Sequence, residues 1–228
     1  MSYYHFKCPA TIVLSGSSGC GKTTFVKQLL ARKHEMFDCN FEKILWCYGE
    51  PSAKPDIDGI EYYHGIPEVI ENTGSGHMLI IIDDLMTECY NKQICDIFTR
   101  GSHHQLISCI ILNQVLFYKS PVSRTISLNT KYLICFKSPR DKRQFEYLAR
   151  QMYPQNSKEL VRVFNEATSQ AYSYFIIDFG QETNEWLRFK TDIFNPIYSA
   201  ICYVNTKQKN DQVEFKTIEG QQVFVVHP

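Results

Sequence analysis

A glycine-rich segment near the amino terminus places the strongest constraint on how this chain can fold. The segment reads Gly16-Ser17-Ser18-Gly19-Cys20-Gly21-Lys22-Thr23 and is followed by Thr24, so it fits the pattern G-x-x-x-x-G-K-[ST] at every fixed position. Residues 10–15 before it, Ala10-Thr11-Ile12-Val13-Leu14-Ser15, predict a short buried strand, and residues 22–32 after it carry apolar side chains at helical spacing. Strand, glycine loop and helix in this order predict a loop that binds the phosphates of a nucleoside triphosphate.

Each residue type in this loop has a physical task. Glycines let the backbone curl so that the N–H groups of residues 16–24 point at phosphate oxygens, and the helix N-terminus adds the positive end of its dipole. We expect Lys22 to hold the β- and γ-phosphates and the Thr23 hydroxyl to occupy one coordination position of Mg²⁺. Cys20 is expected to contribute only its backbone. The alternative is a strand-to-helix turn that binds nothing.

The composition narrows the class of protein. A chain of 228 residues with 44% apolar content suits one large domain, or one domain with an appendage. Its 24 basic and 24 acidic residues balance, so DNA would have to meet a local basic patch. Nine cysteines, without a C-x-x-C pair, argue against a disulfide framework or a zinc site and for small core residues in a reducing compartment. Neither a secretory signal nor an apolar run of about 18 residues occurs, which predicts a soluble, intracellular protein that is not secreted.

Strand and helix signals alternate after the glycine loop. Apolar runs predict strands over residues 43–48, 60–64, 78–82, 109–112, 132–136 and 172–179. Helical spacing predicts helices over residues 87–100, over residues 139–153 with Ser138 as N-cap and Pro139 at the first helical position, and over residues 158–168. Such alternation predicts an α/β fold of the P-loop NTPase (RecA/ASCE-like) type, in which helices cover both faces of a mostly parallel sheet.

From Asn195 onward the sequence changes to a polar tail. Two strand-like pieces, residues 212–216 and 222–226, are joined through Glu219-Gly220 and predict a β-hairpin or a partner-binding extension. The chain therefore divides into a P-loop domain, residues 1–194, and a C-terminal extension, residues 195–228.

Two adjacent carboxylates, Asp83 and Asp84, follow the apolar run at residues 78–82. Desolvated charges at the end of a buried strand need compensating partners, and ligands of α/β sheets bind at that edge. We expect Asp83 to reach Mg²⁺ directly or through water, and Asp84 to polarise a water that attacks the γ-phosphate. The alternative is a pair that caps the helix over residues 87–100. Neither Asp83 nor Asp84 begins the D-x-x-G pattern of switch GTPases, and Asn129-Thr130-Lys131-Tyr132 does not fit their N-K-x-D pattern.

Gln114 closes the apolar run at residues 109–112. If that strand lies between the strand of the glycine loop and the strand that ends at Asp83, Gln114 can sense the γ-phosphate or position water. The alternative is an amide that caps a loop. Hydrolysis also needs a positive group on the transition state, which ring ATPases commonly take from a neighbouring subunit. The candidates are Arg100, Arg124 and Arg140, each of which could equally be a surface arginine.

Taken in order, these motifs resemble those of the poxvirus-type DNA-packaging ATPases of the FtsK-HerA superfamily, and within them most of all those of Polinton-like (Maverick) elements and related viruses. The resemblance covers about residues 8–194. It rests on the glycine loop, Asp83-Asp84, Arg100-Gly101-Ser102-His103-His104, Gln114, Arg124-Thr125-Ile126-Ser127-Leu128-Asn129, Lys137-Ser138-Pro139-Arg140-Asp141-Lys142 and Leu148-Ala149-Arg150-Gln151-Met152-Tyr153-Pro154. Asp84 departs from the pattern, because many relatives in the wider superfamily carry Glu there.

The resemblance implies a motor that hydrolyses ATP with Mg²⁺ and threads double-stranded DNA into a capsid. It implies a homo-oligomeric ring, pentamer or hexamer, and capsid or portal-like vertex proteins as partners. The place of action would be the host-cell interior, nucleus or cytoplasm, or the virion. It also implies that Gln114 senses the nucleotide and that Arg100 is the arginine that acts on a neighbouring subunit, with Arg124 as a further catalytic candidate.

The residues alone leave other functions open. Lys137, Arg140, Lys142 and Arg143 form one basic cluster that could meet DNA phosphates, and Arg100 with His103 and His104 forms another; the alternative for the first is a solvated helix start. A small-molecule phosphotransferase such as a nucleoside kinase would use the same glycine loop, with residues 140–143 as an arginine-rich lid. A scaffold that binds ATP without turnover would use the loop as well.

Overall fold

The computed structural model describes residues 5–51, 54–101, 105–195, 201–203, 213–218 and 221–226. Within them one sheet runs in the order β10-β11-β9-β8-β7-β6-β1-β5-β4-β2-β3. The strands are β1 (Thr11–Ser15), β2 (Phe41–Tyr48), β3 (Glu61–His64), β4 (His77–Asp83), β5 (Ile107–Asn113), β6 (Tyr132–Phe136), β7 (Tyr174–Asp178), β8 (Phe189–Thr191), β9 (Ile201–Tyr203), β10 (Val213–Ile218) and β11 (Gln221–Val226).

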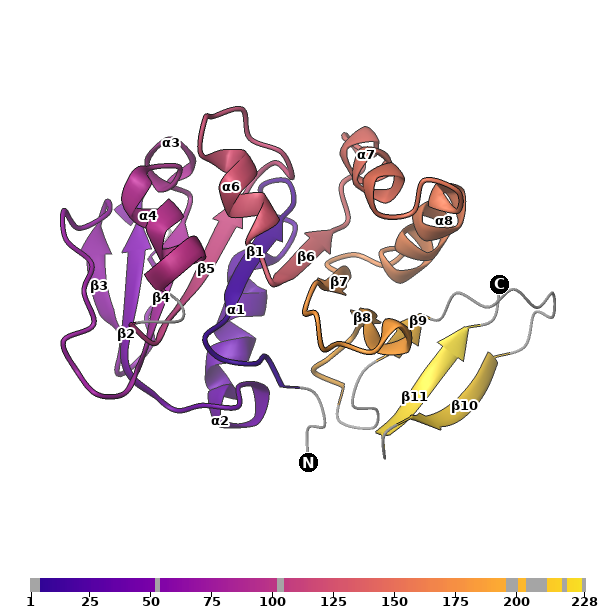
Figure 1. Ribbon diagram of the computed structural model, residues 1–228, viewed down its shortest axis with the longest axis horizontal. Coiled ribbons are helices and arrows are strands. Elements are labelled where there is room, and N and C mark those ends of the chain that lie inside the picture. Colours follow the sequence, from indigo (N-terminus) through magenta and orange to yellow (C-terminus); the bar gives the residue numbers. More distant parts are fainter. Residues whose placement is uncertain are drawn as a thin grey trace.

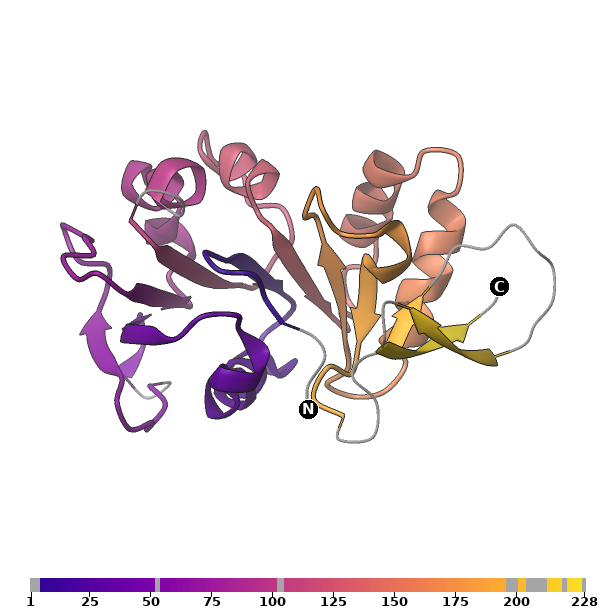
Figure 2. The ribbon, with the colours of Figure 1, turned by 60° about the horizontal axis from the view of Figure 1, so that its bottom comes forward.

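Helices lie on both faces of this sheet (Figures 1 and 2). They are α1 (Lys22–Ala31), α2 (Lys33–Met36), α3 (Met86–Cys89), α4 (Lys92–Asp96), the π-helix η2 (Ile97–Gly101), α6 (Ser123–Leu128), α7 (Arg143–Met152), α8 (Ser157–Ala167) and the 3₁₀ helix η3 (Glu185–Leu187). Among the described helices none is long and apolar enough to span a bilayer.

The centre of the sheet is parallel, as predicted. Strands β6, β1, β5, β4, β2 and β3 all run in one direction. Strand β7 joins β6 antiparallel, and β8 joins β7 in the same way. The α/β fold with a mostly parallel sheet and helices on both faces is confirmed, and the central strands begin and end within a few residues of their predicted bounds.

Alternating side chains explain why the central strands read as continuous apolar runs. In β4, Leu79 and Ile81 belong to the core that packs under α1, whereas Ile80 and Ile82 belong to the core on the opposite face. Successive residues of a strand point to opposite faces, so a strand covered on both sides is apolar at every position. The strands are thereby held rigidly enough to position the residues at their ends.

Two predicted helix bounds are wrong. Residues 87–100 do not form one helix, because Asn91 has extended backbone angles and its side chain accepts a hydrogen bond from the backbone N–H of Ile94, 2.9 Å away, which starts a new helix, α4. The π-helix η2 then ends the segment. Helix α7 begins at Arg143 and not at Pro139. Its first turn is anchored by Gln144, whose side-chain oxygen accepts from the backbone N–H of Leu116 at 2.6 Å.

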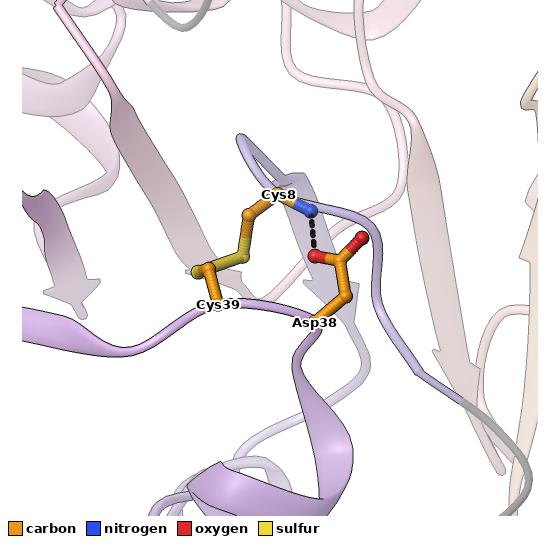
Figure 3. A group of neighbouring side chains, drawn as sticks. All are labelled: Cys8, Asp38 and Cys39. Atoms are coloured by element: carbon orange, nitrogen blue, oxygen red, sulfur yellow. Dashed lines mark hydrogen bonds between the residues drawn. A yellow bond between two sulfur atoms is a disulfide. The ribbon is translucent and has the colours of Figure 1, made fainter.

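A disulfide joins Cys8 to Cys39, contrary to the expectation of unpaired cysteines (Figure 3). It connects the segment before β1 to the segment before β2, where the backbone N–H of Cys8 also donates to Oδ1 of Asp38 at 2.6 Å. A pair formed between residues 31 positions apart has no signature in local spacing. Most of the other cysteines with described side chains are buried core residues, as expected: Cys47, Cys89, Cys109 and Cys135.

The C-terminal strands extend the main sheet. Strands β10 and β11 pair antiparallel, with Val213 opposite Val226, as expected of a hairpin, and β11 pairs with β9. The Glu219-Gly220 turn lies outside the described residues. The division between a domain at 1–194 and an extension at 195–228 stays a prediction.

Candidate functional site: a phosphate loop beside paired carboxylates

Three strand ends and the glycine loop meet at one edge of the sheet. Strand β1 ends at Ser15, directly before the loop, and pairs with β5, whose last residue Asn113 lies opposite Ser15. On the other side of β5 lies β4, with Asp83 opposite Leu112. Because β5 lies between β1 and β4, Gln114 follows its strand between the loop and the carboxylates. The sequence predicted a role for Gln114 only if its strand lies between the strand of the glycine loop and the strand that ends at Asp83, and β5 has that position.

The loop has the backbone that its glycines allow. Gly19 and Gly21 have φ of 76° and 104°, in the left-handed region that favours glycine. At Gly16 a Cβ atom would lie 2.6 Å from Sγ of Cys20 and 2.8 Å from Cβ of Phe136, so a side chain would not fit. Within the described residues no side chain caps the N-terminus of α1, and no acidic residue lies in its first turn. The first amide groups of α1 are therefore suited to an anion.

Lys22 and Thr23 lie where a triphosphate and a metal ion would need them. The Lys22 ammonium donates to the carbonyl oxygens of Gly16, at 2.6 Å, and Ser17, at 3.1 Å, so it lies over the loop. The Thr23 hydroxyl donates to Oδ2 of Asp83 at 3.4 Å. A hydroxyl and a carboxylate are hard oxygen ligands of the kind that Mg²⁺ prefers. The oxygen donors of Thr23 and Asp83 fit this metal.

The environment of Asp83 disfavours its charge. Its side chain is buried, and this desolvation, together with the neighbouring Asp84 carboxylate, raises its pKa from 3.8 to about 6. Lys22 and the Thr23 hydroxyl act in the opposite direction but do not offset the burial. A divalent cation beside Asp83 would stabilise the charged carboxylate and offset the cost of burying that charge. Burial of Asp83 therefore favours metal binding at this site.

Asp84 is exposed and held in an unusual backbone conformation. Its φ is 56°, in the left-handed region that aspartate tolerates better than most residues. Its Oδ1 accepts a hydrogen bond from Nε2 of Gln114 at 2.7 Å. The alternative interpretation as a helix cap is wrong for this pair, because Leu85, and neither aspartate, occupies the N-cap position of α3. Asp84 and Gln114 form a pair that the sequence predicted only as separate residues.

A cavity of about 600 Å³ opens at this edge. Asp83, Asp84 and Gln114 line one side, and aromatic side chains line the side nearer to β6 and β7. Sequence reasoning missed the aromatic side, because single aromatic residues in a strand, a helix or a turn carry no motif. The full lining is Ser18, Gly19, Gly21, Lys22, Thr23, Thr24, Phe25, Gln28, Asp83, Asp84, Leu112, Gln114, Phe136, Tyr172 and Tyr174.

Arg100 lies away from this cavity. It is exposed at the end of η2 and lines a separate hollow of about 580 Å³ with Glu71 and Gln105. Glu71 precedes β4 and Gln105 precedes β5, so Arg100 lies at the amino ends of the parallel strands, the edge opposite to Lys22. The structure does not bring Arg100 to the glycine loop of its own subunit.

The other two arginines line two different cavities. Arg124 is on α6 and lines a cavity of about 380 Å³ with Val13, whose side chain belongs to the core on the face opposite to α1. Arg140 lines a cavity of about 320 Å³ together with Ser17 and Gln114. Of the three candidates, Arg140 shares a cavity with the glycine loop of its own chain.

The basic clusters are only partly available for a polyanion. The Lys137 ammonium donates to the carbonyl oxygen of Ser169 at 2.6 Å. The rest of that cluster is exposed before and at the start of α7: Arg140, Lys142 and Arg143. In the second cluster, His103 and His104 lie outside the described residues.

Comparisons with solved structures identify the same fold elsewhere. The genome-packaging NTPase of Sulfolobus turreted icosahedral virus 2, in complex with ATP-gammaS, superimposes with a TM-score of 0.51 at 13% identity, over 80% of this chain and 96% of that chain. Its complex with AMPPCP gives 0.53 at 12% identity, over 80% and 96%. The DNA-packaging ATPase of Sulfolobus turreted icosahedral virus gives 0.52 at 12% identity, over 81% and 97%. No protein-family model and no curated protein matches the sequence. At these identities the likeness is one of fold.

Proposed function

We propose that this chain is an ATP-hydrolysing translocase motor that packages double-stranded DNA into a capsid. The observation that carries the proposal is the contact of Thr23 with Asp83 beside the bonded pair of Asp84 and Gln114, all at the rim of one glycine loop. The fold shared with viral genome-packaging ATPases supports the choice among P-loop activities. The ordered motifs support a place in the FtsK-HerA superfamily, near the ATPases of Polinton-like elements and poxvirus-type viruses.

The chemistry follows from the side chains around the loop. The amides of residues 16–24 bind the phosphates, and Lys22 transfers its hydrogen bonds from the carbonyls of Gly16 and Ser17 to the β- and γ-phosphate oxygens. Thr23 and Asp83 hold Mg²⁺, which when bound offsets the charge that develops on the phosphates. Each of these groups stabilises the transition state by position and charge.

Asp84 polarises the attacking water. Its Oδ2 is the carboxylate oxygen not engaged by Gln114, and it accepts a hydrogen bond from the water. Gln114 fixes the orientation of the carboxylate, so the water is held in line with the γ-phosphate. Asp84 has a shorter side chain than the Glu of many relatives, and its left-handed backbone directs the carboxylate into the cavity.

The remaining positive charge comes from a neighbouring subunit. Arg100 lies at the amino edge of the sheet, so it can serve only the nucleotide of another copy. A ring of five or six subunits supplies that neighbour, with DNA in its centre and capsid or portal-like vertex proteins at its face. Such a motor acts in the interior of the host cell, nucleus or cytoplasm, where virions assemble.

One assay tests the proposal. ATP hydrolysis by the full chain is measured with and without duplex DNA, for the natural protein, for Lys22→Ala, and for Lys27→Ala, an exposed lysine on the same helix. We expect duplex DNA to stimulate hydrolysis in the natural protein and in Lys27→Ala, and Lys22→Ala to be inactive. Absence of stimulation in an assembled ring contradicts the motor. Phosphate transfer to nucleosides would indicate a kinase, and ATP binding without turnover would indicate a scaffold.

A further inference from the structure

The aromatic side of the main cavity has a rigid base. Phe25 of α1 packs edge-on against Tyr174, with ring centroids 4.8 Å apart, and against Phe136 at 5.9 Å. The Tyr174 hydroxyl accepts a hydrogen bond from the backbone N–H of Ile193 at 3.0 Å. These three rings are held by the cores of the fold, so they form a fixed wall beside the glycine loop.

Tyr172 stands apart from this wall. Its side chain lines the same cavity, yet it is 70% exposed. It lies against the glycine loop, because a Cβ on Gly21 would be 3.5 Å from the Cδ1 atom of its ring. Its φ is 63°, a conformation that is costly for a bulky residue. The turn before β7 thus keeps a large aromatic ring open to solvent, next to a phosphate-binding loop, at a cost in backbone energy.

The direction of a bound nucleotide follows from the charges around the loop. Thr23 and Asp83 hold the metal, and Asp84 with Gln114 faces the γ-phosphate, so the terminal phosphate lies on the side of β4 and β5. Strands β6 and β7 lie on the other side of β1. The nucleoside end of the ligand must leave the loop toward that side, which is where Tyr172 lies.

We propose that Tyr172 provides the aromatic face on which the base of the bound nucleoside triphosphate stacks. The proposal rests on the proposed function only in that the glycine loop binds a nucleotide. An exposed ring is the right partner for a base, because every nucleobase has an apolar π-face and stacking needs no fixed hydrogen bonds. Thr24 and Gln28, four residues apart on α1, add polar side chains to the same cavity.

The test compares a nucleotide with its phosphates alone. Affinities for AMPPCP and for inorganic tripolyphosphate, each with Mg²⁺, are measured by calorimetry on the full chain. Tyr172→Asn removes the ring while retaining a residue that tolerates the left-handed backbone. We expect it to weaken AMPPCP binding by about 5- to 100-fold and to leave tripolyphosphate binding unchanged. Tyr172→Phe retains the face and should bind both ligands as the natural protein does.

Two outcomes would overturn the proposal. Unchanged AMPPCP affinity in Tyr172→Asn excludes stacking, and an equal loss for both ligands means that the ring only supports the shape of the loop at Gly21. Tyr147→Gln, at another exposed tyrosine outside the cavity, should change neither affinity. The motor function is tested separately, by the stimulation of hydrolysis by duplex DNA in the natural protein. That stimulation can be observed even if the stacking proposal fails.

Discussion

Gln114 donates a hydrogen bond from its side-chain amide to Oδ1 of Asp84 at 2.7 Å, which links the ends of two neighbouring strands, β5 and β4. The contact joins a carboxylate in a strained backbone conformation to an amide that follows a buried strand. One oxygen of Asp84 is thereby fixed, and the orientation of the other follows from it. Gln114 is expected to act on the reaction through Asp84.

This relationship predicts a double-mutant cycle. Asp84→Asn should lower kcat for ATP by about 10²- to 10⁴-fold, because it removes the base that polarises water, while nucleotide affinity is retained. Gln114→Ala should lower kcat by a smaller factor. The double variant should be no slower than Asp84→Asn alone, since Gln114 has nothing left to orient. Steady-state kinetics at saturating ATP and Mg²⁺ measures all three, and factors that multiply would show that Gln114 acts independently.

The buried carboxylate of Asp83 is expected to lower the stability of the metal-free protein at neutral pH. Its raised pKa, about 6 against 3.8, means that the folded state binds more protons than the unfolded state between these values, so stability falls as pH rises through them. Without metal, the ionised group costs about 3 kcal/mol at pH 7, as an upper bound. Asp83→Asn should therefore melt higher than the natural protein at pH 7.5 in chelator, and the difference should vanish near pH 4.

Mg²⁺ should reverse the order of the two melting temperatures, so that the natural protein melts higher than Asp83→Asn. It stabilises the ionised form of Asp83, so the Mg²⁺-dependent rise in melting temperature in the presence of AMPPCP should be smaller in Asp83→Asn and should weaken below about pH 6. Thermal unfolding across pH, with Mg²⁺ and with chelator, gives both readings. An Asp83→Asn variant that gains as much stability from Mg²⁺ as the natural protein would exclude Asp83 as a ligand.

Two glycines of the loop should differ in their response to alanine. At Gly16 an added Cβ collides with Cys20 and Phe136, whereas at Gly19 it meets open space but requires a φ of 76°. Gly16→Ala should abolish AMPPCP binding because the loop must shift. Gly19→Ala should cost about 1–2 kcal/mol of stability, the price of a left-handed residue, with binding partly retained. Equal affinities in the two variants would contradict this account.

The position of Arg100 predicts complementation between subunits. Arg100→Ala should bind ATP but not hydrolyse it, and Lys22→Ala should do neither. Mixing the two should restore part of the activity, since a Lys22→Ala subunit can lend its arginine to a neighbour. Arg140→Ala is the matched comparison, because Arg140 shares a cavity with Ser17 of its own chain and its loss should not be rescued by mixing. If mixing rescued Arg140→Ala but not Arg100→Ala, Arg140 would be the arginine that acts on a neighbouring subunit.

The Cys8–Cys39 disulfide predicts a redox-dependent stability. Its loop spans 31 residues, for which cross-linking typically contributes about 2–4 kcal/mol. Reducing agent should lower the melting temperature of the natural protein and leave that of Cys8→Ser unchanged. Cys95→Ser, at a free and half-buried cysteine, should respond to the reductant as the natural protein does.

Patterns that are local in sequence predicted most of the fold and the centre of the site. The apolar runs that became β4, β5 and β6 are buried on both faces, and the glycine loop lies between a strand and a helix as its motif requires. The two wrong helix bounds differ in kind. Gln144 in the first turn of α7 contacts the backbone of Leu116, which is distant in sequence, whereas Asn91 caps α4 locally and divides a helix that apolar spacing alone would continue.

Other features depend on the path of the chain and could not be found in a motif. Cys8 and Cys39 meet only after the segments before β1 and β2 are brought together. Tyr172 lies in a turn among polar residues, and its importance appears only when that turn is found beside Gly21. The sequence identified Arg100 by its order among the motifs. Its separation from Lys22 appears only in the fold, where Arg100 lies at the amino ends of the parallel strands and Lys22 lies at their carboxyl ends.

The opposite placement of Lys22 and Arg100 means that one contact between two copies can join the amino edge of one sheet to the phosphate loop of the other. A two-fold interface would make this contact twice, and each copy would give an arginine to the partner from which it receives one. A head-to-tail ring makes the contact once per interface, so every subunit has one neighbour as donor and the other as recipient. Such a ring has a direction, and this direction would give sequential hydrolysis a rotational sense.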